Sequence, residues 1–309
     1  MNFEELIGHQ STRRLRRARA WFQYVTQWHH RMALDIPKLR EELSPIFVIG
    51  ANRSGTSVVS HLLSQHPDVE GLFSGYTRPQ YNELGHSLGF CESTHIWNHL
   101  MPEAEARQRR GHLPFWGLPA YIGQTYRDRA FGDRERLRLA WDVISYRCTD
   151  KIPLLKNNFN SLRVGLITDV FPRARFVLIC RPWQEFTPRA IQKWANAKAG
   201  VVFDRPLTGF HWNMVNLVAR YDLEIFAPGQ YAIICLNALN AGPVQASEAL
   251  SRVTAGLSLT PHEFDLTVLA SHWKQNAAPP SPQSPGLADV AAIVEAERRV
   301  IASTHSGDA

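Results

Sequence analysis

The chain has 309 residues, of which 44% are apolar and 20% charged, as in ordinary folded proteins. This length is enough for one large α/β domain or two small ones. A net charge of +6 suits an anionic ligand or an acidic surface, and it says nothing about the fold. No apolar run reaches about 18 residues and the N-terminus lacks an apolar signal core, so we expect no membrane-spanning helix and a cytoplasmic location.

The N-terminal region carries a basic amphipathic pattern. Apolar side chains recur at helical spacing over residues 12–34, with several arginines in the first turns, and we treat residues 1–44 as a helical extension. We favour packing of this helix on the domain, or on a second copy in a homodimer, over docking to acidic lipid or nucleic acid.

The next segment joins a strand to a helix through a short polar loop. The sequence IFVIGANRSGTS, residues 46–57, predicts a buried strand at 46–50 and a helix at 54–65, which ends at His66-Pro67. Residues 70–130 have weak periodicity and many aromatic side chains, and we predict a largely helical lid insertion over a site.

Strands and helices alternate through the rest of the chain. We predict strands at 152–156, 175–181 and 230–236, and helices at 160–170, 184–198, 210–226, 244–257 and 287–303. This alternation predicts a three-layer α/β fold with a mainly parallel central sheet flanked by helices. The domain would span 45–276, and the Pro-rich loop and terminal helix of 277–309 would pack on it.

The loop after the first strand has the chemistry of an anion site. Gly50 and Gly55 permit a tight turn, and the N-terminus of the following helix offers backbone N–H groups and a positive dipole end. Arg53 adds a planar guanidinium suited to phosphate or sulfate oxygens. Hydroxyl groups come from Ser54, Thr56 and Ser57.

Two features argue against a nucleoside-triphosphate site. In the loop GxxxxGK[ST], a lysine follows the second glycine, and here Thr56 takes that place. The strand at 175–181 ends in Arg181, where an ATP-dependent enzyme commonly has an aspartate for Mg²⁺. We therefore expect a metal-free anionic donor. The four cysteines lie far apart without CxxC spacing, and no metal site is predicted from them.

Two segments carry a resemblance to a known family. IFVIGANRSGTSVVSHLLSQHPDV, from residue 46, resembles the first signature of the sulfotransferases that use 3′-phosphoadenosine-5′-phosphosulfate (PAPS). FPRARFVLICRPWQEFTPRAIQKW, from residue 171, resembles the second, and the likeness continues through His211-Trp212-Asn213 to about residue 260. The resemblance implies a P-loop-like fold. It also implies metal-free transfer of a sulfuryl group from PAPS to a hydroxyl, or less favourably an amine, of a small molecule or glycan, with PAP as product.

The resemblance also implies roles for individual residues. The donor site would comprise Asn52, Arg53, Ser54, Gly55, Thr56 and Ser57 around the 5′-phosphosulfate, and Arg181, Thr187 and Arg189 around the 3′-phosphate. The chain departs from the family at two of these places. Pro182 follows Arg181 directly, where the family usually has Arg-Asp-Pro, and Arg189 stands where the family has a serine. Thr187 is the nearest hydroxyl.

Catalytic roles are assigned partly from the resemblance and partly from the residues themselves. Lys156 ends a strand as the family's lysine does, and with Arg53 it would stabilise charge on the leaving phosphate. Relatives often have a catalytic histidine within two residues of that lysine, and this chain has Asn157 and Asn158 there. We favour Glu83 as the general base, then His86, with Glu92 and His95 also open.

Two other functions stay open at this point. A kinase with an altered P-loop would bind ATP with Mg²⁺. A non-catalytic module would use the same fold to bind a sulfated or phosphorylated partner without turnover. Calorimetric titration with PAP and with ATP separates these alternatives.

Overall fold

The computed structural model describes residues 38, 41–51, 53–73, 93, 140, 143, 150–183, 186 and 205–270. The chain divides into two units, Met1–Leu39 and Arg40–Ala309. All the elements named below belong to the second unit. In the described part of the chain, no helix is long and apolar enough to cross a membrane.

A five-stranded parallel sheet forms the centre of the second unit. The strands are β1 (Ile46–Ile49), β2 (Val69–Gly71), β3 (Ile152–Lys156), β4 (Arg175–Cys180) and β5 (Tyr231–Cys235). Their order in the sheet is β2-β3-β1-β4-β5, so β1 lies between β3 and β4. Parallel pairing requires crossover connections, and open parallel sheets commonly bind ligands outside the carboxyl ends of the strands, where the strand order reverses.

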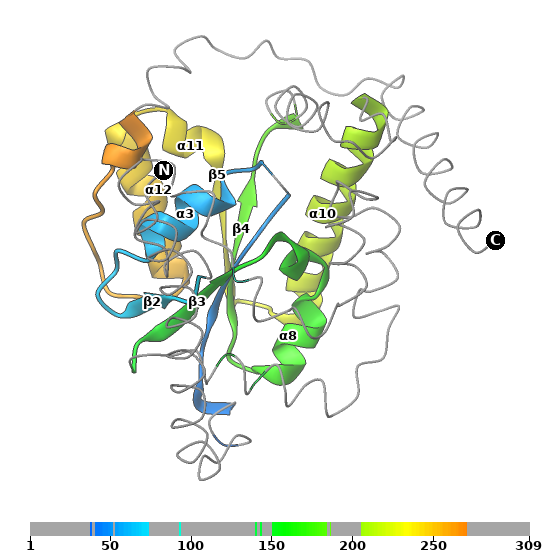
Figure 1. Cartoon of the computed structure of the whole chain (residues 1–309), viewed down its shortest axis with the longest axis vertical. Helices are drawn as coiled ribbons and strands as arrows, with labels where there is room; N and C mark the ends of the chain where they lie inside the picture. Colours follow the sequence, from blue (N-terminus) through cyan, green and yellow to red (C-terminus); the bar gives the residue numbers. More distant parts are fainter. Residues whose placement is uncertain are drawn as a thin grey trace, which may run out of the picture. The chain divides into compact units, whose positions relative to one another are not determined.

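Helices cover both faces of the sheet (Figure 1). The helices α3 (Thr56–Leu63), α11 (Leu236–Asn240) and α12 (Pro243–Gly256) lie on one side. On the other side are α8 (Val164–Val170) and α10 (Arg205–Phe226), with the short 3₁₀ helix η3 (Asn158–Leu162) ahead of α8. The predicted three-layer α/β fold with a parallel central sheet is therefore confirmed. The predicted lid insertion at 70–130 falls outside the described residues except at 70–73 and 93.

Side-chain alternation along β1 divides the core into two layers. Ile46 and Val48 face α3 and α12, where they pack with Leu62, Val177 and Leu250. The intervening Phe47 faces the other way, and its ring lies 5.7 Å from that of Phe176 and 6.4 Å from that of Phe171. All four β1 side chains are fully buried. A strand buried on both faces appears in sequence as a continuous apolar run, which explains why β1 and β4 were predictable.

The structure differs from the sequence-based prediction in four elements. The helix predicted at 160–170 is instead the 3₁₀ helix η3 followed by the shorter helix α8. The three-residue strand β2 was not predicted, because so short a strand gives no periodic signal. Helix α11 begins directly at the end of β5, without an intervening turn residue. Helix α10 begins five residues earlier than predicted, at Arg205, since a proline at the second position is tolerated in a first turn.

Other predictions lie outside the described residues. These are the helix at 12–34, most of the lid at 70–130, the helix at 184–198 apart from 186, the Pro-rich loop and the terminal helix at 287–303. The domain boundaries at residues 44 and 276 stay predictions.

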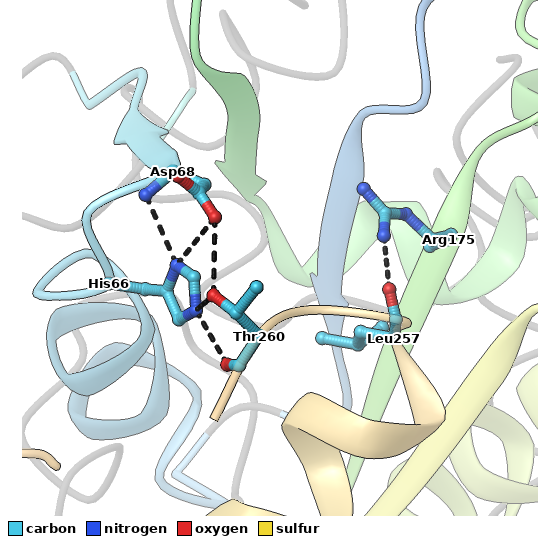
Figure 2. A network of polar contacts seen from close by, with 5 residues as sticks. All are labelled: His66, Asp68, Arg175, Leu257 and Thr260. Atoms are coloured by element: carbon cyan, nitrogen blue, oxygen red, sulfur yellow. Dashed lines mark hydrogen bonds and ion pairs between the residues drawn. The ribbon is translucent and has the colours of Figure 1, made fainter. Parts of the chain in front are cut away.

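A polar network fixes the segment after α12 against the start of β2 (Figure 2). The buried ring of His66 donates from Nε2 to the carbonyl of Thr260 at 2.9 Å and accepts at Nδ1 from the backbone N–H of Asp68 at 3.1 Å. The Thr260 hydroxyl donates to the Asp68 carboxylate at 3.3 Å. Nearby, the Arg175 guanidinium donates to the Leu257 carbonyl. The network lies at the amino ends of the strands, away from the ligand edge.

His66→Leu should lower the free energy of unfolding by about 1–3 kcal/mol, because it leaves buried polar partners unsatisfied. Chemical denaturation measures this change. His262→Leu is the matched control, since the His262 ring contacts the rings of His66 and Phe264 and is not part of this hydrogen-bond network. Equal losses in the two variants would show that the hydrogen bonds contribute nothing beyond ring packing.

Candidate active site

Three neighbouring strand ends bring the predicted residues together. Strands β3, β1 and β4 are parallel and adjacent, so the residues that follow them meet at one edge of the sheet. The register pairs Val48 with Lys156 and Ile49 with Leu178. The loop after β1 is therefore flanked by Lys156 on one side and by Arg181 on the other.

Glycines set the path of this loop. Gly50 has φ +144°, and a Cβ built there would lie 2.6 Å from the carbonyl oxygen of Ile179 in β4. Gly55, at φ +94°, caps α3, and a Cβ there would lie 2.6 Å from a methyl carbon of Leu236. Both positions thus exclude a side chain by conformation and by contact. They hold the loop tightly between β4 and α11.

The remaining loop residues are arranged for an anion. Arg53 adopts φ +70°, an uncommon left-handed conformation for a residue with a side chain, and it is exposed. Ser54 is fully buried, and its hydroxyl has no hydrogen-bond partner among the residues that the structure describes. A buried hydroxyl without a partner costs free energy, so this one indicates a place for a ligand or water oxygen. Ser57 is half-buried in the first turn of α3.

The 3₁₀ helix η3 anchors the loop from behind. The Ser161 hydroxyl accepts from the Gly50 N–H at 2.8 Å and donates to the Gly50 carbonyl at 3.3 Å. The Thr56 hydroxyl donates to Oδ1 of Asn158 at 3.2 Å. Asn158 occupies the place where relatives often have a catalytic histidine, and here its side chain binds the loop. Sequence reasoning missed both anchors, because the run of short polar side chains directly after β3 does not indicate which distant residues they contact.

Lys156 lies at the carboxyl end of β3 and is only 2% exposed. Its backbone N–H donates to the Ser93 hydroxyl at 3.0 Å, and its carbonyl accepts from the Ser93 N–H at 2.7 Å. The Ser93 hydroxyl in turn donates to the Leu72 carbonyl at 2.7 Å. These contacts fix the lysine backbone beside the loop and were not foreseen.

Arg181 connects β4 to the loop. It is 6% exposed, and its guanidinium donates to the backbone carbonyl of Arg53. The carbonyl of Arg181 accepts from the indole N–H of Trp212 at 2.9 Å, and the Trp212 ring lies edge-on to Trp183 at 6.0 Å. Trp212 of α10 therefore packs behind the arginine.

Cys180 directly precedes Arg181 and is paired in register with Cys235 of β5. Burial raises the pKa of the Cys180 thiol to about 11; the adjacent Cys235 adds to the rise and Arg220 opposes it. The thiol is therefore neutral at physiological pH. It places no negative charge beside Arg181.

The structure thus brings together Arg53, Ser54, Gly55, Thr56, Ser57, Lys156 and Arg181. Five other predicted site residues lie outside the described residues, namely Asn52, Glu83, His86, Thr187 and Arg189. The assembled part supplies backbone N–H groups, hydroxyls and cations at one sheet edge, and the residues that directly follow β1, β3 and β4 include no carboxylate. Such a set binds an oxyanion and stabilises charge that develops on it.

Comparison with known proteins finds a matching family and similar solved structures. A family model described as "Sulfotransferase family" matches residues 45–248. The structure of sulfotransferase STF9 from Mycobacterium avium aligns with a TM-score of 0.56 and 14% identity, over 92% of this chain and 80% of that one. At this identity the likeness shows a shared fold. No curated protein matches the chain.

Two other sulfotransferase structures are similar at a lower TM-score. One is STF1 from Mycobacterium tuberculosis H37Rv, with a TM-score of 0.45 and 15% identity over 89% of this chain and 79% of that one. The other comes from Alicyclobacillus acidocaldarius, with a TM-score of 0.46 and 16% identity over 85% of this chain and 96% of that one.

Iodoacetamide at pH 8 should alkylate Cys235 about tenfold faster than Cys180, because Cys235 is exposed and the Cys180 thiol remains protonated. Mass spectrometry of the two peptides over time measures both rates. Equal rates would contradict the burial of Cys180.

Since the folded state holds the Cys180 proton more tightly than the unfolded chain, the contribution of this proton to stability is present below about pH 9 and is lost as pH rises toward about 11.

Proposed function

The chain belongs to the sulfotransferase family, and from this premise we propose that it transfers a sulfuryl group from PAPS to a hydroxyl of a small molecule or glycan. The acceptor oxygen forms a bond to sulfur while the bond between sulfur and the 5′-phosphate oxygen breaks. The acceptor proton passes to a base, and PAP leaves.

One observation carries the proposal. A phosphate-type loop that lacks the P-loop lysine contains a buried serine hydroxyl without a described partner, and it lies between two cationic strand ends, Lys156 and Arg181. A metal-free donor with several anionic groups matches this set better than a triphosphate with Mg²⁺. The kinase alternative would need carboxylates for the metal, and none directly follows β1, β3 or β4.

The loop and Lys156 would serve the 5′ side of the donor. Ser54, Thr56 and Ser57, the α3 N-terminus and the Arg53 guanidinium would hold the phosphosulfate oxygens, together with Asn52. Lys156 would stabilise the negative charge that builds on the leaving phosphate. By comparison with deletions of single oxyanion donors, loss of one such cation would lower the rate about 10²–10³-fold.

Arg181 would serve the 3′-phosphate, with Thr187 and Arg189 on the segment that follows it. An arginine at position 189 in place of the family's serine would bind this phosphate through a charge-assisted contact. Arg181 also holds the Arg53 carbonyl, so it would shape the loop that receives the 5′ side.

The general base and the acceptor are assigned from sequence. We propose Glu83, then His86, as the base, because Asn158 cannot take a proton and instead binds Thr56. The aromatic segment at 70–130 would line the acceptor pocket. A cytoplasmic location and a homodimer through residues 12–34 are part of the same proposal.

PAP should bind in calorimetric titration without Mg²⁺, and ATP with Mg²⁺ should bind more weakly or not at all. Arg53→Ala should weaken PAP binding about tenfold, because it removes one charge-assisted contact to phosphate. Arg173→Ala is the matched control, since this exposed arginine lies at the opposite end of β4.

Binding of ATP with Mg²⁺ and no response to PAP would overturn the proposal in favour of a kinase. PAP binding without turnover of PAPS on any acceptor would favour a non-catalytic module.

Ser161→Ala should weaken PAP binding about tenfold, although Ser161 makes no contact with the donor in this proposal. The change leaves the Gly50 N–H and carbonyl without their anchor, so the loop loses its fixed path. Thr254→Ala is the control, because it removes a buried hydroxyl that donates within α12, to the carbonyl of Ser251. If both variants lose stability alike and neither loses PAP affinity, the contact with Gly50 serves folding alone.

A further inference from the structure

An apolar groove runs along the exposed side of α10. It is lined by Leu217, Val218, Tyr221, Ile225 and Phe226 and has a volume of about 700 Å³. Leu217 is 66% exposed and Ile225 49%. Leu217, Tyr221 and Ile225 are spaced by four residues, so they form one stripe along the helix. We call these five residues the α10 groove.

The apolar surface continues onto the edge strand β5. The Tyr231 hydroxyl donates to the Glu224 carboxylate of α10 at 2.6 Å, which places the Tyr231 side chain on the α10 side of the sheet. Ile233, two residues further along, faces the same way and is 45% exposed. Four of the five exposed large apolar side chains in the described part of the chain thus belong to α10 and β5. Water contact with so many apolar side chains on one side is unfavourable.

The chain itself continues past the described residues with a segment suited to cover this surface. After Ala270 there are 39 more residues, 271–309. Within them Val290, Ile293, Val294, Val300 and Ile301 recur at spacings of three, four and seven, which predicts an amphipathic helix at 287–303. Such a helix needs an apolar surface to bury its stripe.

The connecting segment is long enough to reach the groove. Leu269 is buried in the layer formed by α3 and α12, so the chain leaves the described core on the side of the sheet opposite α10. Residues 271–286 include the Pro-rich stretch AAPPSPQSPG, and at about 3.1 Å per residue in extended form they span about 50 Å. A helix is about 10 Å across, so this reach exceeds the thickness of the three layers.

The size of the groove favours one helix over a second copy of the chain. Residues 217–225 cover about 12 Å of helix length, which matches two turns of a packing helix. A stable interface between two copies commonly buries about 800 Å² on each partner, and a stripe this short supplies little of it. We propose that the C-terminal segment 287–303 docks as a helix in the α10 groove and completes the domain. This inference is independent of the proposed reaction.

Hydrogen–deuterium exchange of the full chain tests the proposal. Amides of 287–303 should exchange about tenfold more slowly in the natural sequence than in Leu217→Glu, because a carboxylate in the groove opposes helix docking. Val244→Glu is the matched control: Val244 is 63% exposed on α12, which packs on the other face of the sheet, and this variant should leave the exchange unchanged.

A second variant, in the docking segment itself, tests the same contact if Leu217→Glu misfolds. Val294→Glu lies in the docking segment and leaves the described core intact; it should speed exchange in 287–303 and also in the 217–225 amides. Three results would overturn the proposal. The first is fast exchange of 287–303 in the natural sequence. The second is protection of 287–303 that increases with protein concentration while the mass becomes that of a dimer. The third is that 12–34 is protected and 287–303 is not, and that Leu217→Glu removes the protection of 12–34.

Discussion

The end of β1 can lie against β4 only because residue 50 has no side chain. A Cβ there would lie 2.6 Å from the carbonyl oxygen of Ile179, well inside van der Waals contact. The rest of the site depends on this approach. It lets the Ser161 hydroxyl reach both polar groups of Gly50, and it starts the turn that delivers Gly55 to the N-terminus of α3. The backbone geometry at Gly50 and Gly55 thus sets the position of the anion-binding edge, and charged side chains lie on either side of it.

The layout of the sheet was predictable from sequence because its central strands are buried on both faces. Continuous apolar runs marked β1, β3 and β4, and the polar residues at their ends fell at one edge as a direct result of parallel pairing. Arg181 was found as the residue at the end of an apolar strand, whereas Lys156 was assigned through the family resemblance. Sequence gave weaker signals where an element is very short, as in β2, or where a helix follows a strand without a turn, as at α11.

The contacts behind the loop were not predictable, because they join residues that are more than 100 positions apart. Ser161 meets Gly50 across 111 positions, and Asn158 meets Thr56 across 102. Local patterns carry no information about such pairs. A short polar residue after a strand is equally consistent with a turn, a helix cap or a ligand contact. Arg189 rests on the family resemblance, and Glu83 rests on its place in a short polar segment of the sequence; both lie outside the described residues.

The contact between Arg181 and the Arg53 carbonyl couples the residue that follows β4 to the loop that follows β1. A guanidinium that fixes a neighbouring backbone also fixes the direction of the side chain carried by that backbone. Replacing Arg53 would therefore reduce the free energy of anion binding by less in a protein that already lacks Arg181 than in the intact chain. The effects of the two replacements on binding would not add. By the same coupling, an anion held at one end of the edge would raise affinity at the other, in equal measure in both directions. Ligand fragments that occupy either end alone would then underestimate the affinity of the whole.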